Sequence, residues 1–162
     1  MPRLPRKPKP LIGWREWVAI PALGIAAIKV KVDTGARSSA LHAFNIEIFE
    51  SGGQDMVRFK VHPFQNDTRT TVEGVAPLID RRTVRNSAGQ STIRPVILIE
   101  IELAGQRWPI ELTLTRRDAM GFRMLLGRQA VRRRFQIEPA RSFLAGRAPG
   151  QLPRKKRRRT TE

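Results

Sequence analysis

The sequence predicts an all-β domain, a barrel or a sandwich, on three observations. Short apolar or alternating runs recur through the middle of the chain, separated by the Gly, Pro and polar residues that are typical of turns. Only residues 128–135 place apolar side chains at helical spacing. The chain has 162 residues, of which 40% are hydrophobic, and this suits one domain around a single core.

The expected elements are short strands joined by turns, with one helix near the end of the domain. Alternation is clearest in residues 97–103 and 110–115, where every second side chain is apolar. Residues 86–89 (Asn-Ser-Ala-Gly) predict the tip of a hairpin, and residues 104–106 predict a second turn. A short apolar strand at 124–127 leads directly into the helix at 128–135. The other expected strands are residues 14–20, 25–32, 44–49, 56–61, 77–84, 92–103 and 108–115.

The charge of the chain is strongly positive. Lys and Arg number 31 against 14 Asp and Glu, a net charge of +17. Residues 1–10 carry four of the positive charges and residues 151–162 carry a net of five, so residues 11–150 retain +8. We expect residues 1–10 to form a Pro-rich disordered arm, residues 11–144 the folded domain, and residues 145–162 a disordered basic tail. The two arms either keep the protein soluble or contact a ribosome or RNA through counterion release.

Composition excludes several classes of site. The chain has no Cys and two His, so it has no thiolate zinc site, disulfide framework or thiol nucleophile, and no metal site or cofactor is expected. No apolar run approaches the ~18 residues that a membrane span requires. The N-terminus is basic but lacks the apolar region of a secretory signal, so a cytoplasmic location is expected.

The motif that carries chemistry is Asp-Thr-Gly at residues 33–35. A β-branched strand runs into it, so the Asp33 carboxylate emerges at the end of a strand. Aspartic proteases present their catalytic carboxylates in this way, and two such groups that share one proton can activate a water. A lone Asp-Thr-Gly is also a common structural turn. The later Leu-Leu-Gly-Arg (125–128), an apolar strand that enters a helix, completes the order expected of a retroviral-type protease, with the 86–89 hairpin as a flap between them.

The chain also resembles one family over nearly all of residues 11–140. The resemblance is carried by IGWREWV (12–18), KVDTGARSSALHA (31–43), DRRTVRNSAG (80–89), WPIELTLTRRDAM (108–120) and FRMLLGR (122–128). These segments are similar to the bacterial retropepsin-like RimK-associated peptidases, long labelled ATP-dependent zinc proteases. The sequence has neither a phosphate-binding G-x-x-x-x-G-K-[ST] loop nor a zinc constellation, so that label does not fit it.

The resemblance implies a single-lobe, retropepsin-like closed barrel with a flap hairpin and one short C-terminal helix, assembled as a two-fold homodimer. It implies a peptidase that acts beside ligases which add glutamate to protein C-termini. In this reading Asp33 is catalytic. Thr34, Gly35 and Ala36 support the loop, with Thr34 bonding across the dimer. Because one motif supplies one carboxylate, the second comes from the partner chain or from Asp118, which otherwise pairs with the arginines before it.

Four further residues are candidates for substrate binding. Arg37 lies on the motif loop, and His42 lies in the family-like segment that follows it. Arg81 and Arg82 precede the flap tip, and strand alternation sends one of the two toward the cleft. Each also has a structural interpretation, as an ion pair, a packed histidine or a solvated charge.

The function expected from the sequence is an aspartic endopeptidase acting on acidic, glutamate-rich protein tails, since a basic body and flap arginines suit a polyanionic chain. The alternative is a non-enzymatic ribosome- or RNA-binding β-barrel. That alternative has few aromatic platforms for bases, because the chain contains no Tyr.

Overall fold

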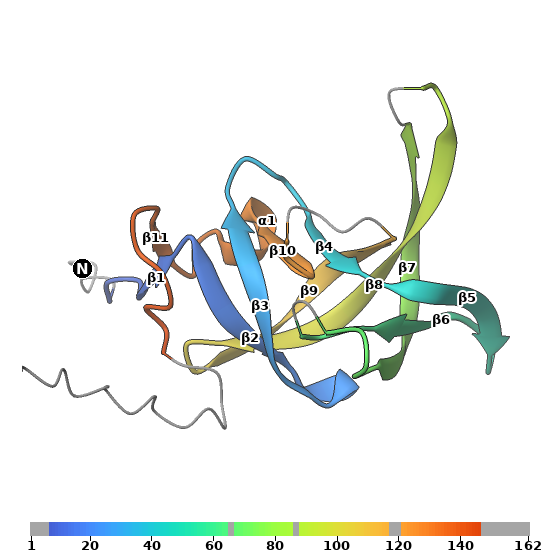
Figure 1. Cartoon of the computed structure of the whole chain (residues 1–162), viewed down its shortest axis with the longest axis horizontal. Helices are drawn as coiled ribbons and strands as arrows, with labels where there is room; N and C mark the ends of the chain where they lie inside the picture. The colour runs from blue at the N-terminus through green and yellow to red at the C-terminus, as the bar shows by residue number, and fades with distance from the viewer. Residues whose placement is uncertain (1–6, 65–66, 86–87, 117–120, 147–162) are drawn as a thin grey trace, which may run out of the picture.

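The structure is a computed structural model, and it describes residues 7–64, 67–85, 88–116 and 121–146 (Figure 1). Within these residues the fold is almost entirely β, with one 3-10 turn, η1 (Pro21–Leu23), and one helical turn, α1 (Arg128–Val131). The strands are β1 (Leu11–Gly13), β2 (Arg15–Ile20), β3 (Ile25–Asp33), β4 (Ser39–His42), β5 (Phe44–Ser51), β6 (Gln54–Val61), β7 (Val72–Arg85), β8 (Ser91–Leu103), β9 (Gln106–Thr115), β10 (Met124–Gly127) and β11 (Gln136–Glu138).

Six of these strands close into a barrel in the order β2-β3-β10-β4-β9-β8, which the pairing of Ala19 with Glu102 completes. The strand β10 lies between β3 and β4, parallel to the first and antiparallel to the second. This arrangement brings the chain that leaves β3 and the chain that leaves β10 to the same end of the barrel. The fold class predicted from the sequence, an all-β closed barrel with one short helix, is therefore confirmed.

The barrel interior is filled by alternate side chains, as the period-2 pattern predicts. Along β8, Ile97, Ile99, Ile101 and Leu103 are buried, whereas Leu98 between them is 43% exposed. The strand β9 repeats the pattern with Leu112 and Leu114 facing the core. The same alternation fixes which side chains of each strand face outward.

Three strands extend from the barrel at β8. The second half of β7 pairs with β8 and forms a long hairpin that rises above the barrel in Figure 1, while its first half pairs with β6, and β6 pairs with β5. The ladder between β7 and β8 shifts between Leu78 and Asp80, where β7 passes from one partner to the other. The hairpin expected around residues 86–89 is thus present, although residues 86 and 87 lie outside the described residues.

Some elements differ from expectation. The helix predicted over 128–135 ends at Val131, because Arg132 leaves helical geometry at ψ 140° and Arg133 takes the left-handed φ of 66°. This turn lets Phe135 pack against Trp108 and sends β11 to pair with β1. The short strands β1, β4 and β11 were not predicted, since three or four residues carry too little pattern to recognise. Other bounds shift by a few residues, most at the start of β7, which begins at Val72.

The two ends of the domain are joined by Glu16, a fully buried carboxylate on β2. Its Oε2 accepts hydrogen bonds from the backbone N–H groups of Gly13 and Leu144, at 2.7 and 3.0 Å, and its Oε1 accepts one from Ala145 at 3.0 Å. Three N–H donors thus compensate the burial of this charge.

No helix in the described part of the chain is long and apolar enough to cross a lipid bilayer.

Candidate active site

Asp33 is the last residue of β3, opposite Gly127 at the end of β10. Its Oδ1 accepts hydrogen bonds from the backbone N–H groups of Gly35 and Ala36, at 3.0 and 3.2 Å. These bonds fix one carboxylate oxygen against the loop. Asp33 is half-buried and Thr34 is exposed. The second carboxylate oxygen is therefore available to a water or a ligand.

The glycine of the motif lies close to the Asp33 carboxylate. Gly35 does not adopt a left-handed φ, and a Cβ added to it would lie 3.2 Å from Asp33 Oδ1. That contact is tight against the same oxygen that the Gly35 N–H binds. A side chain at position 35 would therefore crowd the Asp33 carboxylate.

The base of the loop rests on the segment from β10 to α1. The Gly127 N–H donates to Ser39 Oγ at 3.0 Å, and the Arg128 N–H donates to the Ala36 carbonyl at 2.8 Å. A Cβ on Gly127 would overlap the backbone of Ser38 and come within 3.0 Å of the Ala36 carbonyl oxygen. The Leu-Leu-Gly-Arg segment therefore holds the Asp33 loop by backbone contacts that only glycine permits at position 127.

Strand register places Asp33 on the outer face of the barrel. Lys31, Leu125, Ala40 and Thr113 pair in one row across β3, β10, β4 and β9, and they alternate with core residues. Asp33 follows Lys31 by two residues and so shares its face. Sequence reasoning did not single out Lys31, although the spacing of two along a strand carries the signal.

Arg82 lies on the same face as Asp33, whereas Arg81 lies on the opposite face of β7. The guanidinium of Arg82 contacts Glu111 at 3.1 Å and Asp80 at 3.7 Å. Arg81 is exposed and, among the described residues, forms no ion pair. The pair is thus divided between the two faces of the sheet, as alternation predicts.

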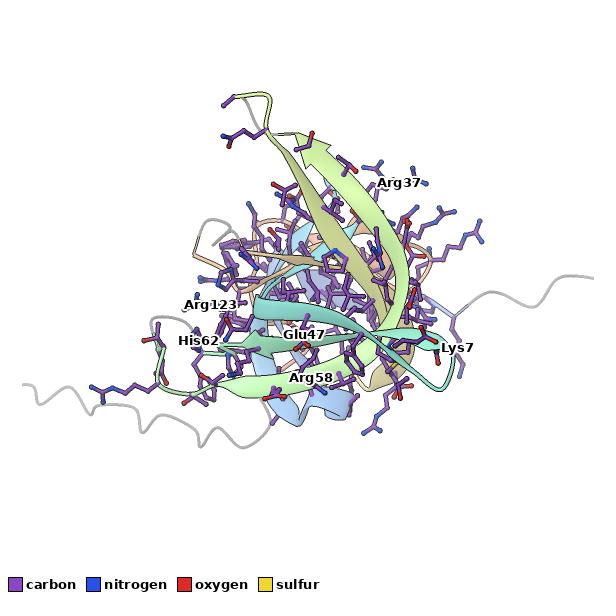
Figure 2. The ribbon with its side chains drawn as sticks, turned by 90° about the vertical axis from the view of Figure 1, so that its right-hand side faces the viewer. Lys7, Arg37, Glu47, Arg58, His62 and Arg123 are labelled. Atoms are coloured by element: carbon purple, nitrogen blue, oxygen red, sulfur yellow. The ribbon has the colours of Figure 1, made fainter. Side chains whose placement is uncertain are left out.

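Arg37 and His42 lie at opposite ends of β4. Arg37 is exposed on the Asp33 loop, and its carbonyl accepts a hydrogen bond from the Gln129 N–H at 3.1 Å. The half-buried His42 is level with Arg123, whose carbonyl accepts the His42 N–H at 2.8 Å. Figure 2 shows Arg37 and Arg123 well apart. Four residues of β10 separate the level of His42 from that of Asp33, roughly 13 Å along the strand.

Asp118, the alternative intrachain partner of Asp33, lies outside the described residues. Among the residues that are described, no cluster of three or more His, Asp or Glu side chains could hold a metal ion.

Two residues that support the Asp33 loop were not predicted from the sequence. Ser39 accepts the Gly127 N–H, and the Arg128 side chain donates to the Gly35 carbonyl at 3.3 Å. Both contacts join segments about 90 residues apart, so no local pattern signals them.

A one-lobe barrel that presents Asp-Thr-Gly at the end of one strand, held by a glycine-ended strand beside it, defines a retropepsin-like protein. Residues 11–148 match the family described as "RimB-like: Retropepsin-like aspartic endopeptidase RimB". The chain belongs to this family, and the family predicted from the sequence is confirmed.

Relatives and a solved structure are similar to this chain over most of its length. The chain is 51% identical over 132 residues to a "Probable alpha-L-glutamate ligase" of Desulfotalea psychrophila, and 46% identical over 136 residues to one of Shewanella pealeana. The matches cover 82% and 84% of this chain but only 28% and 30% of those relatives, so the chain spans less than a third of their length. A crystal structure of a Legionella pneumophila protein of unknown function has a TM-score of 0.70 and 26% identity, covering 84% of this chain and 98% of that one.

Proposed function

We propose that this protein is an aspartic endopeptidase in which Asp33 of two copies forms the catalytic pair. The observation that carries the proposal is the Asp33 carboxylate, fixed through one oxygen by two backbone N–H groups and half-exposed on the outer face of the barrel. The described part of one chain supplies one such carboxylate. A two-fold axis beside the loop would supply the second from an identical site.

The chemistry follows from two carboxyl groups that share one proton. The ionised carboxylate takes a proton from a water, whose oxygen attacks the carbonyl carbon of the peptide bond. The protonated carboxyl gives its proton to the carbonyl oxygen, forming a neutral tetrahedral diol. Collapse of the diol breaks the C–N bond as the amide nitrogen gains a proton, and the two carboxyl groups again share a single proton. The step needs water and no other co-reactant.

We propose acidic peptide segments, such as glutamate-rich protein tails, as the substrate. The relatives that contain this domain are named as glutamate ligases, which associates the domain with glutamate-bearing products. Lys31 and Arg37, near Asp33, are free of carboxylate ion pairs among the described residues. Guanidinium and ammonium groups so placed stabilise substrate carboxylates and attract an anionic chain. A cytoplasmic location suits such a substrate.

The experiment is hydrolysis of a glutamate-rich peptide, with products identified by mass. Asp33→Asn should lower the rate at least ~1000-fold, because an amide cannot accept the proton from water. The fold should persist, since an amide oxygen still accepts the Gly35 and Ala36 N–H groups. Asp55→Asn, an exposed carboxylate on the β5–β6 hairpin, is the matched control and should retain full activity.

Unchanged hydrolysis by folded Asp33→Asn would overturn the proposal. Salt-sensitive RNA binding by a protein that cleaves no acidic peptide would support the RNA-binding alternative instead.

A further inference from the structure

A hollow of about 690 Å³ opens beside the base of the β7–β8 hairpin. It is lined by β5, β7, β8 and the end of β9. Figure 2 views the molecule from the side of β5 and β6. The hollow is separate from the Asp33 loop, because none of residues 33–38 lines it.

Three arginines line this hollow: Arg81 from β7, Arg94 from β8 and Arg116 at the end of β9. In the described part of the chain none of the three forms an ion pair. Other arginines on the barrel and its extension are paired, such as Arg58 with Glu47 and Arg107 with Glu102. Arg94 pairs with Arg82 across β7 and β8, so its side chain lies on the other face of the sheet from Arg81. Arg81 and Arg116 are the two cationic side chains on the side of the hollow, and an anion placed between them relieves their repulsion.

The walls of the hollow are apolar. Ile46 and Ile48 come from β5, and Ile93 from β8 is 63% exposed. These aliphatic side chains offer apolar contacts beside the exposed guanidinium groups. The hollow is therefore suited to a carboxylate on an aliphatic stem, the chemistry of an acidic side chain in a peptide.

The register of β4 and β9 gives the position of the hollow relative to Asp33. Asp33 lies opposite Gly127, whose N–H binds Ser39, and Ser39 pairs with Leu112 on β9. Leu112 therefore lies at about the same height in the barrel as Asp33. Arg116 follows Leu112 by four residues, which is roughly 13 Å along the strand. The hollow lies on the side of Arg81, the face of the sheet opposite Asp33. An extended peptide whose scissile bond lies at Asp33 therefore needs several further residues, which must pass around the end of the strands to reach the hollow.

We propose that the hollow is a secondary binding site for the acidic side chains of the substrate, several residues from the bond that is cleaved. This inference rests on the proposed function, which it extends by giving the enzyme a preference for long acidic segments. The occupant is one extended acidic peptide, chosen because its carboxylates complement Arg81 and Arg116, which form no ion pair among the described residues. Arg81 and Arg116 are both exposed, and we expect their side chains to give the preference for acidic segments.

The test is peptide binding by the Asp33→Asn protein, in which no cleavage interferes. The probe is a fluorescein-labelled peptide of eight glutamates, measured by anisotropy at moderate salt so that long-range attraction is screened. We expect Arg81→Gln and Arg116→Gln each to weaken binding by about tenfold or more. A peptide of three glutamates cannot reach both sites at once, so it should bind more weakly than the peptide of eight glutamates.

Arg107→Gln is the matched control, since it removes one exposed arginine at the other end of β9 and should leave binding unchanged. Three outcomes would each overturn the proposal. They are failure of the Asp33→Asn protein to bind the long peptide, unchanged binding in both hollow variants, and an equal loss of binding in Arg107→Gln. Cleavage assays with Asp33 intact keep the two proposals distinguishable. If hydrolysis requires Asp33 but is unchanged by substitution of Arg81 and Arg116, the proposed binding site in the hollow is wrong and the proposed peptidase activity stands.

Discussion

Gly127 decides how closely the strand β10 approaches the Asp33 loop. Its missing side chain leaves room for the Ser38 backbone and the Ala36 carbonyl, and its N–H binds Ser39. Glycine in a strand normally weakens it, so a strand glycine in close contact with another backbone has a positional role. The position of the Asp33 carboxylate thus depends on a residue 94 positions away in the sequence.

We expect Gly127→Ala to destabilise the fold by ~2–3 kcal/mol, the usual range for forcing a methyl group into a packed site. Urea unfolding followed by circular dichroism measures the change. The exposed neighbour Gln129→Ala, the matched control, should stay within ~0.5 kcal/mol of the parent. Equal stability of Gly127→Ala and the parent would mean that the loop shifts without cost.

At the scale of elements, the barrel is held at its ends by contacts between distant segments. Glu16 on β2 receives N–H groups from residues 128 and 129 positions later, and β1 pairs with β11. These contacts order both terminal segments around one buried carboxylate. These hydrogen bonds stabilise the fold because they restrict the motion of both terminal segments.

Glu16→Gln should cost about 2–3 kcal/mol, because the amide NH₂ group must face an N–H donor and the charge-assisted bonds are lost. The free energy of unfolding in urea checks this value. Glu100→Gln, an exposed carboxylate on β8, is the control and should have little effect. A Glu16→Gln protein as stable as its Glu100→Gln counterpart would show that the carboxylate is dispensable.

Features set by local sequence patterns could be predicted, whereas contacts between distant segments, such as those of Gly127 and Glu16, could not. The strands with clear alternation and Asp33 at a strand end were predicted, since period-2 burial and the Asp-Thr-Gly turn are local properties. The predicted length of α1 was wrong, because Phe135 fits the helical pattern but packs against Trp108 in a tertiary contact. The partners of Glu16 and Ser39 lie too far along the chain for any local pattern to reveal. Alternation predicts that Arg81 and Arg82 lie on opposite faces, but the register between paired strands was needed to show that Arg82 shares the face of Asp33.

At the scale of the whole molecule, one barrel lobe presents one Asp-Thr-Gly on its outer face. The lobe is also highly charged, with a net +17 over the chain, so two copies repel each other at low ionic strength. A homodimer would therefore be favoured by salt, and an acidic peptide held between the copies would strengthen it.

Mixing active and inactive subunits tests whether two copies share the site. Parent protein is refolded from urea with an equal amount of Asp33→Asn protein, so that subunits exchange at random. If the pair is shared, half of the dimers are mixed and one quarter contain two Asp33 residues, and activity per parent subunit falls to about one half. Independent monomers would keep their full activity. Parent protein refolded with Asp55→Asn controls for losses on refolding and should show no decrease. Retention of full activity after verified exchange with Asp33→Asn would therefore refute the shared pair and require a second catalytic group from the same chain.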